Sequence, residues 1–381
     1  MKITTYFILF LLILGLFNAV NSLPLIDAST PKKVFHNQLI EIHGRNFNLK
    51  DLHSKSKPLR FETFEVNDLG KASTVGNTMA SEINYWEDKE LLSDSNPLIA
   101  NTNKRSIYSE RHASFLLRRP GSGVETAQVA WKNNIGFSLT GKAYVNLWVR
   151  YYWPNNSPSA SYQVKVFSIT SALDKSANST LPDFSLFNWW YAVEAPYTQT
   201  YFRNTWSNTS SGTYMFPNNS LPIKMDPTWI NFAVAIDQGT PNIADGSYTI
   251  YMTNTTGGTI RKKTATNVKL RENSNFFDAF KMGWYIGSTI DIGEVILLFD
   301  DIYFDNSWAR VEIGDKPVYD NCTHREIQIL DSWNRMGNPD PYIEIKINRG
   351  SFENGSAFLF VVDKYGTPSD GYEIEIYDEP K

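Results

Sequence analysis

Hydrophobic and polar residues alternate with a period of two in a dozen segments of this chain, and Gly, Pro, Asn or Asp residues separate the segments. Runs of this kind, rich in Val, Ile, Tyr, Phe and Trp, are typical of β-strands. The clearest are 39–43, 142–152, 161–169, 184–194, 229–237, 247–253, 280–286, 294–304, 325–330, 342–348, 357–363 and 371–377. The best helix candidate is a short segment near 81–92. The pattern predicts an all-β protein of sandwiches or jelly rolls.

The two ends of the chain resemble pieces of one small domain. The stretch Ile40-x-Ile42-x-Gly44-x-Asn46-Phe47 is similar to the opening of an immunoglobulin-like domain of the TIG class. Segments 309–314, 357–366 and 371–377 resemble later strands of that class. Residues 308–381 alone hold about five strands, two fewer than a seven-stranded sandwich needs. We therefore expect residues 23–55 to begin this domain and residues 308–381 to complete it.

A serial arrangement, with residues 23–55 packed as an arm on the large domain, is the alternative. The two arrangements differ in one contact. If the domain is split, Ile40 and Ile42 pair with the C-terminal strands.

The middle of the chain, residues 56–307, resembles a concanavalin-like jelly roll of the kind found in lectins, polysaccharide lyases and laminin-G-type modules. It opens with the strand-like segment 60–65 and closes with the acidic segment 298–305. The resemblance implies that the first strand lies beside the last. As a whole, the chain resembles exported bacterial-type proteins that combine these two modules.

The first residues predict export. Met1-Lys2 precedes an apolar run that ends at small residues before position 22, so residues 1–22 read as a secretory signal peptide. An uncleaved anchor is the alternative, although the run is short for a membrane span. We expect a secreted or cell-surface protein without a membrane span after cleavage. Seven N-x-S/T sequons fit a glycoprotein, but the count is close to what this composition supplies by chance and is no evidence of glycosylation by itself.

Composition narrows the classes of partner. The 381 residues are 42% hydrophobic and 14% aromatic, which argues against a disordered chain. The net charge of −4 gives no basic field for nucleic acid. With Cys322 as its one cysteine, the chain forms no internal disulfide. The aromatic surplus must therefore fill a large core, bind a ligand, or do both.

Alternation divides the aromatic residues between the two faces of each strand. Rings flanked by amides and guanidinium groups suit a sugar, whose apolar face stacks while its hydroxyls hydrogen-bond. The alternative is that these rings pack beneath loops. The candidate ligand-binding residues are Asn146, Trp148, Arg150, Tyr152, Asn188, Trp190, Glu194, Tyr201 and Arg203.

The sequence carries no strong catalytic motif. It has no G-x-S-x-G, no H-E-x-x-H and no cluster of Cys or His. A polysaccharide lyase needs a cation that neutralises a uronate and a base. The nearby pairs Arg150/Tyr152, Arg203/Tyr201 and Lys281/Tyr285 supply such groups, but such pairs are also common by composition.

A calcium site is the remaining candidate. Glu65 on the opening strand would meet Asp300, Asp301 and Asp305 on the closing strand if the two strands pair. Carboxylate oxygens suit Ca²⁺, and such a site would be structural. Surface carboxylates paired with lysines are the alternative.

Three functions remain open. The first is a secreted, non-catalytic protein that binds a polysaccharide or glycoprotein glycan. The second is a polysaccharide lyase or hydrolase acting on an acidic polysaccharide. The third is a structural extracellular protein. A groove with converging Arg, Tyr and polar groups favours the enzyme, and a shallow aromatic platform favours binding.

Overall fold

A computed structural model gives the architecture. The residues that it describes are 23–47, 57–63, 86–89, 98–102, 104–106, 108, 111–119, 123–125, 128–131, 136–152, 162–170, 185–194, 197–205, 213–214, 229–254, 260–271, 274, 276, 278–288, 293–333 and 342–379. Within these ranges the regular elements are strands, with two short 3₁₀ turns, η1 (Phe137–Leu139) and η2 (Tyr319–Asn321). The predicted all-β class is confirmed. The predicted signal peptide lies outside the described residues.

The larger unit is a sandwich of two antiparallel sheets, each of eight strands. The first, called here the β10 sheet, has the order β17-β16-β15-β10-β19-β7-β6, with β4 also paired to β19. Its strands are β4 (Arg60–Glu62), β6 (Leu98–Ala100), β7 (His112–Arg119), β10 (Lys142–Tyr152), β15 (Ile230–Asp237), β16 (Gly246–Asn254), β17 (Arg261–Val268) and β19 (Gly293–Asp305).

The second sheet, called here the β11 sheet, has the order β14-β13-β12-β11-β18-β9-β5, with β8 also paired to β18. Its strands are β5 (Trp86–Lys89), β8 (Gly123–Glu125), β9 (Gln128–Trp131), β11 (Tyr162–Thr170), β12 (Ser185–Glu194), β13 (Tyr197–Thr205), β14 (Thr213–Tyr214) and β18 (Ala279–Ser288). The helix expected near 81–92 is wrong where it can be checked, because Trp86–Lys89 pairs with β9 as a strand.

Aromatic rings hold the two sheets together. Phe167 of the β11 sheet meets Phe232 of the β10 sheet at a centroid distance of 6.3 Å, and Phe280 meets Phe304 at 4.6 Å. All four rings are almost fully buried. The strand pairs of the two sheets are also nested along the chain. Strand β10 pairs with β19 in one sheet, and β11 pairs with β18 in the other, with both β11 and β18 lying between β10 and β19 in sequence. This nesting is that of a jelly roll.

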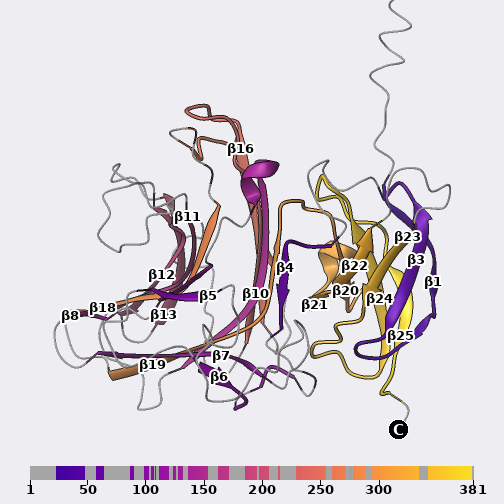
Figure 1. Ribbon diagram of the computed structural model, residues 1–381, viewed down its shortest axis with the longest axis horizontal. Coiled ribbons are helices and arrows are strands. Elements are labelled where there is room, and N and C mark those ends of the chain that lie inside the picture. Colours follow the sequence, from indigo (N-terminus) through magenta and orange to yellow (C-terminus); the bar gives the residue numbers. More distant parts are fainter. Residues whose placement is uncertain are drawn as a thin grey trace, which may run out of the picture.

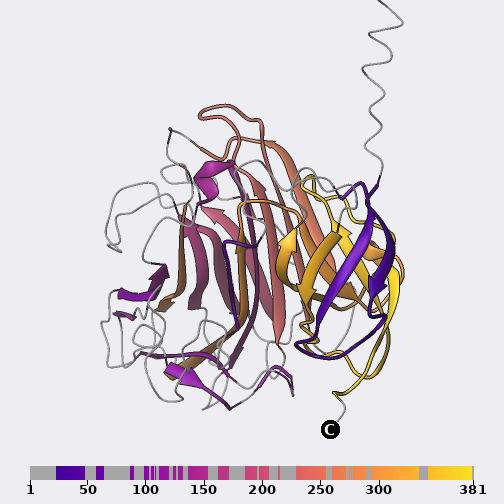
Figure 2. The same ribbon diagram turned by 45° about the vertical axis from the view of Figure 1, so that its right-hand side comes forward.

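The smaller unit is a second sandwich built from both ends of the chain, seen in Figures 1 and 2 as indigo strands beside yellow ones. Its sheets have the orders β1-β3-β23-β22 and β2-β25-β24-β20-β21. The strands are β1 (Leu25–Thr30), β2 (Lys33–Val34), β3 (Leu39–Arg45), β20 (Arg310–Gly314), β21 (Arg325–Ile327), β22 (Ile329–Trp333), β23 (Tyr342–Lys346), β24 (Gly355–Val362) and β25 (Tyr372–Ile376). We call this unit the split sandwich.

Alternation along β3 explains why the chain ends meet. Ile40 and Ile42 are buried while Leu39 is 53% exposed. In the pairing with β23, Ile40 lies opposite Ile345 and Ile42 opposite Ile343. This is the contact expected of a split domain. The likeness of this unit to the TIG class stays a prediction.

The split sandwich packs against the outer face of the β10 sheet, on the side where β4 lies in Figure 1. Tyr144 and Tyr303 of the jelly roll share one buried cluster with Ile327 of β21. Among the described residues, no helix is long and apolar enough to cross a membrane.

The split core generates a test. Ile42→Ala should lower the free energy of unfolding by about 2–5 kcal/mol, because the cavity lies between the N-terminal and C-terminal strands. Leu39→Ala, on the exposed face of the same strand, should change it by about 0.5 kcal/mol or less. Urea denaturation measures both, and equal effects would contradict the burial of Ile42 against β23.

Candidate functional site

The most completely described polar region lies between the two sandwiches. On β10, Val145 and Leu147 point into the jelly-roll core, so the alternate residues Tyr144, Asn146 and Trp148 face the split sandwich. The pairing continues this face onto β15, where Asn231 lies opposite Trp148. Polar and aromatic groups of one sheet face thus meet a second domain instead of solvent.

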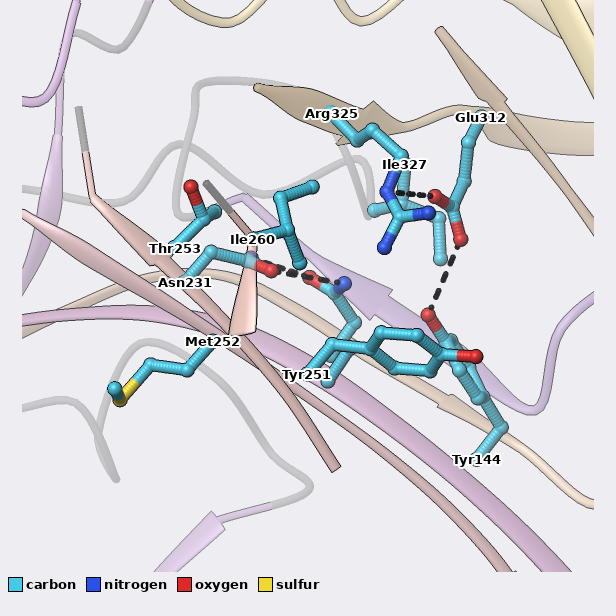
Figure 3. Close-up of a pocket in the computed structure, with 11 residues that line it drawn as sticks. Tyr144, Asn231, Tyr251, Met252, Thr253, Ile260, Glu312, Arg325 and Ile327 are labelled. Carbon is cyan, nitrogen blue, oxygen red and sulfur yellow. Dashed lines mark hydrogen bonds and ion pairs between the residues drawn. The ribbon is translucent and has the colours of Figure 1, made fainter. Parts of the chain in front are cut away.

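A small pocket opens at this interface (Figure 3). Strands β10, β15 and β16 supply one wall, and β20 and β21 supply the other. Its free space is about that of one water molecule, so it holds no sugar ring as it stands. The lining residues are Tyr144, Asn146, Asn231, Ala233, Tyr251, Met252, Thr253, Ile260, Glu312, Arg325 and Ile327.

Glu312 is the centre of the hydrogen-bond network at this pocket. Its carboxylate forms ion pairs with Arg310 and, at 3.3 Å, with Arg325, and it accepts from the hydroxyls of Tyr319 at 3.1 Å and Tyr144 at 3.4 Å. Burial alone would raise the pKa of Glu312, but the two guanidinium groups outweigh it and the pKa lies below its ordinary value. Glu312 is therefore ionised, and its carboxylate already binds four side chains.

The jelly-roll wall of the pocket is also internally satisfied. The Asn231 amide donates to Asn146 at 2.9 Å and to the Leu147 carbonyl at 3.3 Å. The Arg325 guanidinium lies over the ring of Tyr251 at 5.1 Å. The asparagines thus bind within the jelly roll, and the contact between Arg325 and Tyr251 joins the two domains.

A second ion cluster surrounds Arg105, which precedes β7. Its side chain contacts Asp300 at 3.5 Å, Asp301, and Glu326 of the split sandwich at 2.6 Å. All four side chains are at most 6% exposed. The Trp148 indole donates to Glu326 at 3.2 Å, so one carboxylate of the split sandwich binds two groups of the jelly roll.

A β-bulge makes this cluster possible. Asn146 lies opposite Tyr303 and Trp148 opposite Asp300, so two residues of β19 face one of β10. Asp301 adopts a φ of 46° at this bulge, and its side chain joins Asp300 at Arg105. Burial raises the pKa of Asp301 above its ordinary value although Arg105 opposes this. Burial also acts to raise the pKa of Glu326, but Arg105 and His324 lower it overall.

The structure separates the predicted ligand residues into two groups. Trp148 is fully buried and Asn146 is 5% exposed. The split sandwich covers Trp148, and its part in ligand binding stays a prediction. Arg150, further along β10, is half-buried. The side chain of Tyr152 lies outside the described residues.

The other five predicted residues lie on β12 and β13, where the backbone is described. The register sets Asn188 opposite Arg203 and Trp190 opposite Tyr201, with Glu194 opposite Tyr197 at the end of the pairing. These consecutive antiparallel strands therefore bring the residues into adjacent positions of one sheet. The side chains of these residues lie outside the described part.

The predicted calcium ligands are only partly brought together. Asp300 and Asp301 meet around Arg105, while Asp305 accepts a hydrogen bond from the Tyr303 hydroxyl at 3.1 Å. Glu65 lies outside the described residues. Within the described ranges, no three His, Cys, Asp or Glu side chains are grouped to hold a metal ion. Calcium held by these four residues stays a prediction.

Sequence reasoning missed the residues that join the domains. Arg105 lies in a stretch without periodicity, and its partners are up to 221 positions away. One signal was present: Arg310, Glu312, Arg325 and Glu326 put four charges on two short apolar strands. Charges on strands that are otherwise apolar indicate a buried ion pair or an interface.

Comparison with known proteins yields only distant structural likeness. No family model and no curated protein matches the chain. An endo-β-1,4-glucuronan lyase from the fungus Trichoderma reesei aligns at 12% identity and a TM-score of 0.39, covering 59% of this chain and 96% of its own. An alginate lyase from Aplysia kurodai aligns at 14% and 0.40, covering 54% and 86%. Peanut lectin aligns at 11% and 0.36, covering 61% and 95%. Such values assign neither family nor activity.

The Arg105 cluster predicts a large effect of one substitution. Arg105→Met should lower the free energy of unfolding by about 3–5 kcal/mol, because it leaves three buried carboxylates without their cation. Arg45→Met is the matched control, since Arg45 is 66% exposed and its pair with Asp27 at 3.7 Å contributes at most about 1 kcal/mol. Urea denaturation compares them, and similar losses would contradict the cluster's role.

His36 predicts a pH dependence at the same interface. Its ring stacks on Tyr108 at 4.9 Å, and burial, Arg105 and Arg349 lower its pKa from 6.5 to about 4. Between these values the unfolded chain binds a proton that the folded chain does not, so stability falls as pH drops from about 6.5 to 4. His36→Phe should remove roughly 1–3 kcal/mol of this fall. Urea midpoints at pH 7 and 4.5 test it, and an unchanged difference would refute the assignment.

Proposed function

We propose that this chain is an exported, non-catalytic carbohydrate-binding protein whose glycan lies across β12 and β13. The observation that carries the proposal is the register of these strands, which sets Trp190 opposite Tyr201 and Asn188 opposite Arg203. An aromatic pair thus lies beside a polar pair, about 7 Å away along the strands. This is the combination that a sugar needs, with rings for its apolar face and donors for its hydroxyls.

The position of the split sandwich supports the choice of sheet. It covers the outer face of the β10 sheet at Tyr144, Asn146 and Trp148, and each of these side chains hydrogen-bonds within the interface. Within the described residues, the pocket left there has room for about one water molecule. A glycan long enough to cross several strands therefore fits the β11 sheet better than this interface.

A lyase acting on an acidic polysaccharide is the second candidate. Tyr201 and Arg203 lie two residues apart on β13, so both belong to the same set of alternate positions. An Arg that neutralises a uronate carboxylate and a Tyr that removes the adjacent proton are the groups such an elimination uses. The same two residues thus serve either function, and only turnover distinguishes them.

The proposal predicts a loss of binding from two substitutions. Trp190→Ala and Tyr201→Ala should each weaken binding of the best oligosaccharide from a glycan array at least tenfold, a change of about 1.4 kcal/mol. Tyr365→Ala is the control, because Tyr365 is 49% exposed and lies on the split sandwich. Titration calorimetry measures the affinities, and unchanged binding in both variants would refute this location.

A turnover assay separates the two functions. Uronate polymers incubated with the protein, with and without chelator, should show no rise in the ultraviolet absorbance of unsaturated sugar. A rise that Tyr201→Phe abolishes would replace the binding proposal with the lyase. An array without any bound glycan would favour a structural extracellular protein.

A further inference from the structure

His112 is buried in a way that demands an explanation. It opens β7 on the outer face of the β10 sheet and is 0% exposed. Among the described residues, neither ring nitrogen has a hydrogen-bond partner. Most buried polar side chains in proteins are hydrogen-bonded, and an unsatisfied one destabilises the fold. A Leu or Phe at this position would avoid that loss.

The surroundings of His112 are cationic and aromatic. The ring of Trp229 meets the imidazole edge-on at 5.7 Å with an interplanar angle of 77°. Burial, Arg150 and Lys104 lower the pKa of His112 from 6.5 to about 4. The imidazole is therefore neutral at neutral pH and offers one donor and one acceptor.

The pairing of the strands puts Arg150 on the same sheet face as His112, in the neighbouring row of residues. Arg150 lies opposite Leu298, and Leu298 lies opposite Ser114, which follows His112 by two residues on the same face. Arg150 and Ser114 are half-buried, whereas Trp148 in the next row is fully buried under the split sandwich. His112 itself continues the row of Trp148 and Asp300, so its ring is fully buried one row inside the point where the covered part of the sheet face ends.

We propose that His112 and Arg150, with Lys104 and the ring of Trp229, bind the acidic end or branch of a glycan through one uronate residue. A uronate hydroxyl both donates and accepts, so it satisfies a neutral imidazole. Its carboxylate suits Arg150 and the exposed Lys104, and its apolar face suits the indole. An inorganic anion such as sulfate has no proton to give the acceptor nitrogen, and a neutral sugar has no charge for the cations.

This site is distinct from the one proposed on β12 and β13, because it belongs to the other sheet. Its ring is fully covered, so a ligand must enter from the half-buried row of Arg150 and Ser114. The unsatisfied imidazole then gains its hydrogen bonds only in the complex. Stability of the free protein is given up for binding, which is a trade common at binding sites.

Replacing His112 should therefore weaken binding without lowering the stability of the free protein. His112→Leu should weaken binding of a glucuronate trimer at least tenfold in titration calorimetry, while the melting temperature stays the same or rises. His324→Leu is the matched control for stability: its ring is hydrogen-bonded to Ser351 at 3.1 Å and paired with Glu326 at 3.0 Å, so its loss should lower the melting temperature.

Further probes identify what the site recognises. Wild-type protein should bind the glucuronate trimer more tightly than a glucose trimer or sulfate, and Arg150→Gln should abolish that preference even if His112→Leu does not fold. An unchanged affinity of His112→Leu for the glucuronate trimer would overturn the proposal, as would equally tight binding of sulfate. Trp190→Ala reports on β12 alone, so failure here is distinguishable from failure of the proposed glycan site.

Discussion

A single guanidinium held by three carboxylates fixes how the two sandwiches of this protein meet. Arg105 takes Asp300 and Asp301 from the bulge in β19 and Glu326 from β21 of the split sandwich. Buried ion pairs gain little over apolar packing, but each partner becomes strongly destabilising when left alone. The cluster therefore specifies one orientation of the domains, because any other would separate the carboxylate of Glu326 from the guanidinium of Arg105. The hydrogen bond from Trp148 to Glu326 and the network around Glu312 extend the same interface.

That orientation decides which surface is left for a ligand. The outer face of the β10 sheet carries the aromatic and amide side chains that a sugar would use. Tyr144 and Trp148 instead hydrogen-bond to the split sandwich, and Asn146 pairs with Asn231 beneath it. The glycan site proposed here therefore lies on β12 and β13. The margin of the covered face, where burial gives way at Arg150 and Ser114, is the exception. His112 lies one row inside it, and among the described residues its ring nitrogens have no hydrogen-bond partner.

Much of the fold could be predicted from the sequence, because period-two alternation depends only on which face of a strand is buried. The alternation of Ile40 and Ile42 with exposed neighbours correctly predicts pairing with the C-terminal strands. The same logic does not decide what Trp148 faces. Alternation separates the core face of β10 from the opposite face, but it does not tell whether that opposite face meets solvent or a second domain. The pairs Trp190–Tyr201 and Asn188–Arg203 depend on strand register, which a single sequence leaves open. The role of Arg105 could not be predicted, because it lies in no periodic segment and its partners are remote in sequence.

The central claim is that the split sandwich occupies the β10 sheet and leaves glycan binding to the β11 sheet. Hydrogen–deuterium exchange tests it most directly, comparing the free protein with the protein saturated by the neutral oligosaccharide that binds best on an array. The account predicts slower exchange of backbone amides in 185–205 on binding, with those in 230–237 and 246–254 unchanged. Protection confined to 230–237 and 246–254 would place the ligand at the domain interface and contradict the account.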